Sequence, residues 1–297
     1  MLHWTPIERG VTGVPTTGSS PTVSRRELGT LLRTLRIRKG WTAEQVAGRL
    51  MVSPSKVSRL ETGQRGASAR DIRDLCDLYE VGDEQRQHLM ELAIEGKQRA
   101  WWQPLGVPYS RYVGLEAEAT SISDYGLGHV PGLLQTPDYA REVVRAQVPR
   151  WVPDVVEQRV QGRAARQQRL SSGHPPSFEA VVDESVLHRV VGSPAIMRAQ
   201  LERLLELSDL PHVTLRVIPY DAGALPSGNN KFIILRFGQP TVSDVVFIEG
   251  LTGDLYLEEP HDVEVYSTTF RTLAHLAAEP DITRDIITPM IVSYRSV

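Results

Sequence analysis

The chain has 297 residues, of which 41% are hydrophobic and 23% are charged, and its formal net charge is -3 at pH 7. This length exceeds one small DNA-binding module by about two hundred residues, so we expect a second domain with its own core. No stretch approaches the roughly twenty apolar residues of a membrane span, and the first twenty residues lack the apolar core of a signal peptide. Cys76 is the single cysteine, so it cannot form a disulfide within the chain. We therefore expect a cytoplasmic protein without a bound metal or cofactor.

The charge is unevenly distributed along the chain. Between Pro21 and Val81, twelve basic and seven acidic side chains give this segment a net charge of +5, so the remainder carries -8. A basic segment joined to an acidic remainder is typical of a nucleic-acid-binding domain on a body that DNA repels.

The first forty residues divide into two parts. Residues 1–22 are rich in glycine, proline, serine and threonine and show no hydrophobic period, so we predict a disordered tail. Residues 23–39 carry leucines at helical spacing, which predicts a helix that supports the following domain. These leucines are Leu28, Leu31, Leu32 and Leu35.

Two helix starts follow. Thr42 stands three residues before Gln45, the spacing of a capping box, in which a threonine hydroxyl and a glutamine amide each satisfy a free backbone N–H group. Further on, Ser53 precedes Pro54, which pairs a cap residue with the imino acid that suits the first helical position. Apolar residues around the two starts are spaced to pack two short helices across a tight turn. The pattern predicts a helix-turn-helix.

The second of these helices is expected to expose a polar and basic face. Arg59 can form a bidentate fork with guanine, and Lys56 supplies a charge for a phosphate. Ser53 and Ser55 lie at a helix N-terminus, where free N–H groups favour anions. The alternative is a face that is only solvated, since many helical hairpins carry outward lysine and arginine.

A family resemblance supports the first interpretation. The run VSPSKVSRLETG, with WTAEQVAGRL before it and QRGASARDIRDLCDLYEV after it, resembles the lambda-repressor-like XRE family of transcription regulators over about residues 24–82. The resemblance implies a five-helix DNA-binding fold. Ala43 and Met51 depart from the family, which often has a polar residue and a glycine there. The resemblance also implies that Pro54, Ser55 and Arg59, with Lys56 beside them, read the bases. It further implies contacts to the DNA backbone from Thr42, Ser53, Gln64 and Arg65.

Further along, we expect the DNA-binding domain over residues 23–82, then a connecting helix and an aromatic hinge over residues 83–105. Trp101, Trp102 and Pro104 mark the hinge. Residues 106–297 are expected to form an α+β domain. From Gly114 the chain is predicted to form a helix, a loop and a helix. A polar helix over 153–170, a helix over 194–208 and helices over 262–278 and 282–296 are also predicted. Five runs indicate a mainly antiparallel sheet of about five strands: 177–185, 213–219, 231–237, 245–249 and 254–259.

Evidence for catalysis is weak. Glu184 and His188 are spaced to share a metal ion, but a third ligand at useful spacing is missing, so a structural role is favoured. The sequence has no nucleophile elbow, no Walker loop and no glycine-rich dinucleotide motif. We therefore expect that the protein is not an enzyme. In an alternative reading, the C-terminal domain is chiefly an effector-sensing or enzymatic domain, with a pocket near Asp183 and Glu184 and with His129 as a further candidate.

A second resemblance covers about residues 100–290. The runs VPGLLQTPDYAR, RVQGRAARQQRL, VVDESVLHRVVG and FIEGLTGDLYLEE resemble, in that order, the C-terminal domain of an antitoxin-like or WhiJ-like group of actinobacterial regulators. The resemblance implies a control pair with a small partner protein encoded by an adjacent gene. The loop VPGLLQT is the candidate partner surface, although burial between helices is its commoner fate. The candidate residues are Leu133, Leu134, Gln135 and Tyr139.

The combined expectation is a sequence-specific transcriptional regulator. One small domain touches only a few base pairs, so two copies on neighbouring half-sites raise affinity and match palindromic operators. We therefore expect a homodimer that binds double-stranded operator DNA.

Overall fold

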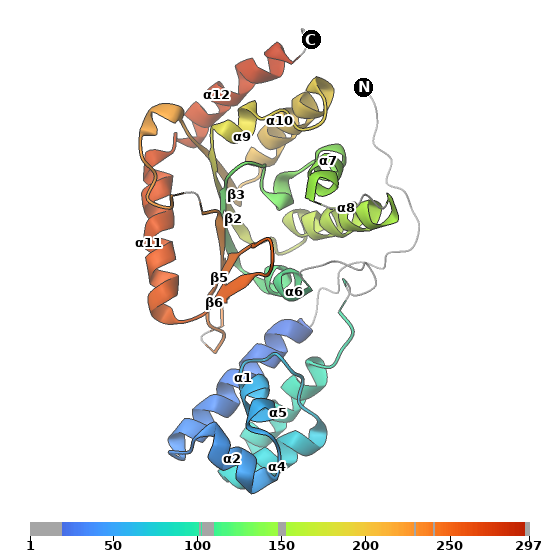
Figure 1. Cartoon of the computed structure of the whole chain (residues 1–297), viewed down its shortest axis with the longest axis vertical. Coiled ribbons are helices and arrows are strands. Elements are labelled where there is room, and N and C mark those ends of the chain that lie inside the picture. Colours follow the sequence, from blue (N-terminus) through green and yellow to red (C-terminus); the bar gives the residue numbers. More distant parts are fainter. Residues whose placement is uncertain are drawn as a thin grey trace.

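The computed structural model describes residues 20–100, 102, 110–147, 153–228, 230–239 and 241–294, and it has two parts (Figure 1). We call the helical part, residues 20–100, the head, and the part built on a six-stranded sheet, residues 110–294, the body. Residues 1–19 of the predicted tail lie outside the described residues, as do Trp101 and Pro104 of the predicted hinge. Among the described residues, no helix combines the length and apolarity that crossing a bilayer requires.

The head contains the five helices that the predicted fold class requires. Three of them begin at a serine or threonine whose hydroxyl oxygen accepts a backbone N–H: α2 at Thr42, α3 at Ser53 and α4 at Ser68. Helix α1 begins two residues before its predicted start, because Ser20 caps it and Pro21 takes its first position. The helices are α1 (Pro21–Arg38), α2 (Ala43–Leu50), α3 (Pro54–Glu61), α4 (Ala69–Tyr79) and α5 (Asp83–Glu95).

The body is built around a sheet with the strand order β3-β2-β1-β4-β5-β6. β1 runs parallel to β2, and β2 runs parallel to β3, whereas the β1–β4, β4–β5 and β5–β6 pairs are antiparallel. The strands are β1 (Ser121–Gly126), β2 (Ser177–Asp183), β3 (Val213–Ile218), β4 (Phe232–Arg236), β5 (Val245–Ile248) and β6 (Leu255–Leu257). The helices are α6 (Ser110–Glu118), α7 (Pro137–Gln147), α8 (Pro153–Gln167), α9 (Ser185–His188), α10 (Pro194–Ser208), α11 (Pro260–Leu276) and α12 (Pro280–Ser293).

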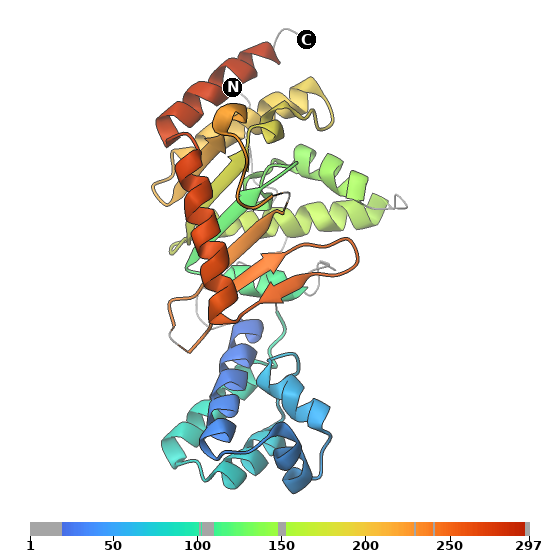
Figure 2. The same cartoon turned by 60° about the vertical axis from the view of Figure 1, so that its left-hand side comes forward.

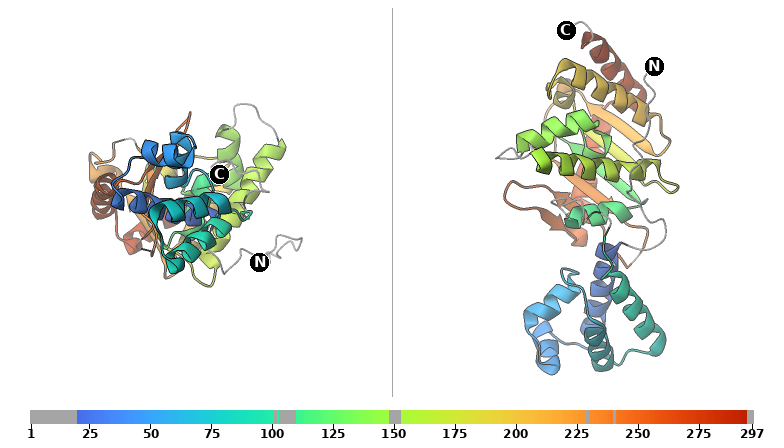
Figure 3. Two further views of the ribbon diagram at one scale, coloured as in Figure 1. Left: turned by 90° about the horizontal axis from the view of Figure 1, so that it is seen from below. Right: turned by 90° about the vertical axis from the view of Figure 1, so that its right-hand side faces the viewer.

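Helices cover both faces of this sheet. Helix α11 crosses one face, and α7, α8 and α10 lie on the other, as Figures 1, 2 and 3 show. On the first face, the ring of Phe232 lies 6.4 Å from that of Phe270 in α11. On the second face, Phe178 of β2 belongs to the same buried cluster as Leu201 of α10. Alternate residues along each strand therefore belong to two separate apolar layers.

The α+β class and the mainly antiparallel pairing are confirmed, since three of the five strand pairs are antiparallel, but one detail of the predicted sheet is wrong. Strand β1 occupies a segment that was predicted to lie within a helix-loop-helix, and it adds a sixth, central strand. The sheet is mixed because α7 and α8 connect β1 to β2 and α10 connects β2 to β3, and such helical crossovers return the chain in the same direction. The five predicted strands are all present.

Helix α1 belongs to both parts of the molecule. Its second half packs in the core of the head through Leu28, Leu32 and Leu35, whereas Val23 in its first turn joins the main core of the body. Gly114 of α6 lies against this first turn of α1: a Cβ atom placed on Gly114 would be 2.7 Å from the Cβ atom of Thr22. The head is therefore attached to the body through a continuous helix.

Charged contacts reinforce this junction. Arg26, which is 6% exposed, donates from Nη2 to the Ser243 carbonyl at 3.1 Å and to Glu258 Oε2 at 3.0 Å. Arg111 of α6 donates to the other carboxylate oxygen of Glu258 at 2.5 Å. The carboxylate thus joins an arginine of the head to an arginine of the body.

Candidate nucleic-acid interface

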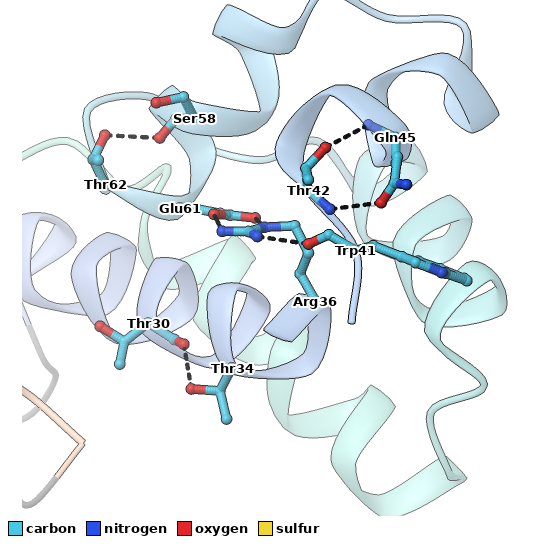
Figure 4. Close-up of polar contacts among 9 residues, drawn as sticks. All are labelled: Thr30, Thr34, Arg36, Trp41, Thr42, Gln45, Ser58, Glu61 and Thr62. Atoms are coloured by element: carbon cyan, nitrogen blue, oxygen red, sulfur yellow. Dashed lines mark hydrogen bonds and ion pairs between the residues drawn. The ribbon is translucent and has the colours of Figure 1, made fainter. Parts of the chain in front are cut away.

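The candidate recognition helix α3 is fixed to α1 by a buried ion pair. Arg36 donates from Nε to Glu61 Oε1 at 2.7 Å and from Nη2 to Glu61 Oε2 at 2.8 Å (Figure 4). Its third nitrogen donates to the Trp41 carbonyl at 2.8 Å, just before α2 begins. The hydrogen bonds to Glu61 raise the pKa of Arg36 above its already high value. One guanidinium therefore links three helices of the head.

The backbones of α1 and α3 also approach closely. A Cβ atom on Gly29 of α1 would lie 2.5 Å from the Glu61 carbonyl oxygen and 2.7 Å from that of Leu60. Only glycine permits this approach. The Arg36 pair and the Gly29 crossing together set the direction in which α3 projects.

The turn between α2 and α3 adopts the conformation that a glycine would favour. Met51 closes α2 in the left-handed region with φ 54° and ψ 43°, and its side chain is 92% exposed. For a residue with a Cβ atom this conformation costs about 1–2 kcal/mol. Met51 thus takes a backbone conformation that a glycine would adopt without this cost.

The three predicted base-reading residues share one exposed surface of α3. Pro54, Ser55 and Arg59 are all exposed, whereas Val57 and Leu60 point into the core of the head. Arg59 donates from Nε to the Ser55 carbonyl at 3.2 Å, and none of the described carboxylates pairs with it. Its remaining guanidinium nitrogens keep their donors for an outside acceptor.

Lys56 lies beside this surface in a different environment. Its ammonium group lies 2.5 Å from Asp71 Oδ1, and both side chains are largely buried. Burial alone would raise the pKa of Asp71, but hydrogen bonds from Lys56 and Ser68 hold it below its usual value. The predicted phosphate contact of Lys56 therefore competes with an ion pair inside the head.

The predicted contacts to the DNA backbone surround α3. Gln64 and Arg65 follow the helix with exposed side chains, and Thr42 is exposed at the start of α2. The hydroxyl oxygens of Thr42 and Ser53 accept the backbone N–H groups of Gln45 and Lys56. A hydroxyl that accepts in a cap still has its own O–H to donate to a phosphate oxygen.

Of the two fates considered for the VPGLLQT loop, the structure shows burial between helices and not an exposed partner surface. Leu133 and Leu134 form a short 3-10 helix and are 4% and 1% exposed, and Tyr139 is fully buried. Gln200 of α10 donates to the Leu134 carbonyl at 2.8 Å. The loop is part of the core between helices, because its apolar residues cover the sheet.

The two carboxylates at the end of β2 have local roles. Asp183 accepts hydrogen bonds from the backbone N–H and the hydroxyl of Ser185. Glu184 lies 3.1 Å from His188 and also accepts the Tyr220 backbone N–H at 2.8 Å. Both side chains stabilise the turns that they belong to, and neither of them lines the cavity described next.

His129 and Gln135 line a cavity in the body, between the sheet and α8. The buried Gln135 amide donates to the Val130 carbonyl at 2.6 Å, and its oxygen accepts a hydrogen bond from Arg163. Burial lowers the pKa of the half-buried His129, and the charge of Lys231 lowers it further. Arg163 and Asp124 also line this cavity. Neither was predicted as a site residue, and Asp124 could not be placed because β1 was not predicted.

Two family models match the chain. A helix-turn-helix domain matches residues 27–89, and a domain of unknown function, DUF5753, matches residues 109–289. The comparisons with curated proteins and with solved structures gave no match. The first model covers most of the head, including the whole of the predicted DNA-binding surface, and the second covers nearly all of the body.

Proposed function

The chain belongs to the DUF5753 family, whose domain is of unknown function, and carries a helix-turn-helix domain before it; on this premise we propose that it is a transcriptional regulator that reads operator DNA with α3. In this proposal α3 lies in the major groove, Arg59 reaches a base edge, and the groups around the helix contact phosphates. The proposal describes a binding protein and assigns it no catalytic step.

The observation that carries this proposal is the contrast between Arg59 and its neighbours. Arg36 and Lys56 are both paired with carboxylates, whereas Arg59 is exposed on the same rigid unit and pairs with no described carboxylate. A fixed helix with a free guanidinium suits bidentate recognition of guanine, which requires the donor geometry to be set in advance.

We also propose that two copies bind together. A single head presents one short helix, and one helix reads too few base pairs to select a site in a genome. Two heads on half-sites about one DNA turn apart double the contacts. The number of chains per DNA fragment, measured by light scattering on the complex, tests this part separately.

The test of base reading is the substitution Arg59→Ala, measured by gel shift on fragments from the native genomic neighbourhood. We expect a loss of about 1–3 kcal/mol and a relaxed preference at one base position. Arg70→Ala is the matched control, because Arg70 is an exposed arginine of α4 that pairs only with Asp74. An equal loss on all sequences would show that Arg59 contacts phosphate only, and the absence of any sequence preference in the unmodified protein would overturn the proposal.

The antitoxin-like role stays a proposal from the family resemblance. It requires a small partner protein encoded by an adjacent gene, and the buried loop at Leu133 and Leu134 is not available as its docking surface. Co-expression of the neighbouring gene followed by affinity purification tests for this partner directly. Recovery of the regulator alone would count against the role.

A further inference from the structure

The topology of the sheet gathers polar side chains at one edge of the body. β4 is antiparallel to β1, and β5 is antiparallel to β4, so the end of β1, the start of β4 and the end of β5 lie together. Asp124, Lys231 and Glu249 come from these three places and line one cavity. The cavity has a volume of about 100 Å³, and α8 covers it with Arg163 and Arg166.

The two arginines of α8 have different partners. Arg166 forms a two-point ion pair with Glu116, with both nitrogen–oxygen distances at 2.6 Å, and Tyr112 donates to the same carboxylate at 2.6 Å. Arg163 donates only to the neutral amide oxygen of Gln135, and no carboxylate pairs with it in the described part of the chain. Burial, with a further contribution from the charge of Arg166, lowers the pKa of Arg163 to about 10.

An arginine in this situation favours an anionic ligand. Taking a cation out of water is costly unless an opposite charge compensates it. Gln135 is itself held by its bond to Val130, so it can offer Arg163 one dipole and no charge. An acid group that enters the cavity would supply the missing charge in a two-point geometry.

Asp124 presents an unpartnered carboxylate to the same cavity. Asp124 is only 7% exposed, and no described side chain or backbone group donates a hydrogen bond to its carboxylate. Its neighbours across the sheet are Ala180 on β2 and Ile233 on β4, which have no polar side-chain atom. Burial raises the pKa of Asp124 to about 7, although the charge of Lys231 acts in the opposite direction.

The rest of the cavity wall is largely apolar and aromatic. Tyr112 of α6 stacks on Phe247 of β5 with ring centroids 4.3 Å apart, and Val130 and Val143 are among the other apolar residues of the wall. Stacked aromatic rings favour a flat ligand body. Lys231 is paired with Glu249, so its charge is compensated within the protein.

We propose that this cavity binds a small organic acid with a flat, ring-sized body, whose acid group binds Arg163 and whose hydroxyl or amino group donates to Asp124. The inference goes beyond the proposed function, because DNA binding by α3 does not require the cavity to be filled. Failure of the ligand test would leave the DNA-binding test unaffected, and the reverse also holds.

The experiment uses three probes on the full-length protein: 3-hydroxybenzoate, benzoate and 3-hydroxybenzyl alcohol. The first carries an acid group and a ring hydroxyl, the second carries the acid group alone, and the third carries the ring hydroxyl with an uncharged hydroxymethyl group in place of the acid. At probe concentrations about tenfold above the dissociation constant, 3-hydroxybenzoate is expected to raise the melting temperature by about 2–4 °C. Benzoate is expected to give a smaller shift, and the alcohol none.

Variants assign each part of the ligand to its residue. Arg163→Gln is expected to weaken the binding of both acids at least about tenfold in calorimetric titration, and Arg163→Lys to restore part of the affinity. Asp124→Asn is expected to leave the affinity for benzoate unchanged and to lower the affinity for 3-hydroxybenzoate to that for benzoate. Arg159→Gln, on the same helix but outside the cavity lining, is the matched control and is expected to change nothing.

Near-ultraviolet circular dichroism shows whether each variant keeps its packed core. The proposal is overturned if none of the three probes shifts the melting temperature of the unmodified protein. It is also overturned if the shift persists in a folded Arg163→Gln variant, or if the alcohol binds as tightly as the acid.

Discussion

The guanidinium of Arg36 and the carboxylate of Glu61 form a two-point ion pair between α1 and α3, with nitrogen–oxygen distances of 2.7 and 2.8 Å. The two side chains are 15% and 7% exposed, so water screens the pair little. Since Glu61 ends α3 and Arg36 also holds the start of α2, the pair fixes the helix-turn-helix to its supporting helix (Figure 4).

Removing one partner of this pair is expected to weaken the head strongly. We predict that Glu61→Gln lowers the free energy of unfolding by about 3–5 kcal/mol, because Arg36 would then be buried without a counter-charge. Urea denaturation, monitored through a spectroscopic signal that comes from the head, measures the change. Asp74→Asn is the control, since the Arg70–Asp74 pair is exposed and is expected to contribute less than about 0.5 kcal/mol. Equal losses of stability in the two variants would show that the Arg36–Glu61 pair contributes no more than an exposed ion pair does.

The turn residue Met51 offers a stabilising substitution. Met51→Gly is expected to raise the stability by about 1 kcal/mol, because glycine adopts the left-handed conformation at φ 54° without a Cβ penalty. Thermal unfolding measures the gain. Met51→Ala separates the backbone effect from the loss of an exposed apolar side chain: alanine keeps a Cβ atom, so a gain as large as that of glycine would contradict this explanation.

Lys56 and Asp71 are expected to act together in DNA binding. While Asp71 neutralises Lys56, Lys56→Ala should change the slope of log affinity against log salt by much less than one unit. In the Asp71→Asn background Lys56 is free to bind phosphate, and the same substitution should reduce the slope by about one unit. Filter-binding titrations over a range of salt concentrations measure both slopes. A full unit lost in the unmodified background would mean that DNA displaces Asp71.

The stability of the body is expected to depend on Asp124 and pH. The pKa of Asp124 is about 7 in the folded protein, against about 4 in an unfolded chain, so the folded state binds more protons between these values. The stability should therefore fall as the pH rises from about 4 to 7 and remain level above it. Asp124→Asn removes this effect and should stabilise the body by a few kcal/mol at pH 8 but not at pH 4.

Thermal unfolding of both proteins across this pH range tests the sign. The charges of Lys231, Glu116, Arg166 and Glu249 also act on Asp124, and their effects are already included in its pKa of about 7. A variant that is destabilised equally at all pH values would show that the carboxylate makes a hydrogen bond that its amide cannot replace.

The junction between head and body is expected to depend on Glu258. Glu258→Gln leaves Arg26 buried beside Arg111 with a weaker partner, and should cost about 1–2 kcal/mol because Glu258 is one-third exposed. Amide hydrogen exchange should become faster in α6 and in the first turn of α1. Glu264→Gln, which breaks the exposed pair with Arg271, is the control. Unchanged exchange at the junction would show that apolar contacts alone hold it.

Local signals in the sequence predicted most of the head. The starts of α2 and α3 follow from Thr42 and from the Ser53–Pro54 pair, because cap residues act on backbone groups only a few residues away. The Arg36–Glu61 pair was not predicted, since the two residues are 25 positions apart and either side chain could have been solvated. Contacts of this kind depend on the crossing of two helices, which spacing alone does not determine.

The body was less predictable because its central strand is atypical. β1 has the sequence SISDYG, and a buried strand usually consists of β-branched and apolar residues. Ser123 and Asp124 are nevertheless buried, at 4% and 7% exposure. Without β1, the order of the sheet and the cavity beside it could not be derived. The five apolar strands, in contrast, were all recognised from their composition.

Helix α1 also determines how the head is oriented around its own axis. Residues of one α-helix are related by a rotation of about 100° each, so the direction of α3 is set by the number of residues between the body contact at Val23 and the head contacts at Leu28 and Gly29. Inserting a single residue between them would turn the exposed surface of α3 by more than a quarter of a circle without altering any side chain on it. In the proposed two-copy complex, the length of this helix would therefore set how the two α3 helices are directed toward neighbouring half-sites.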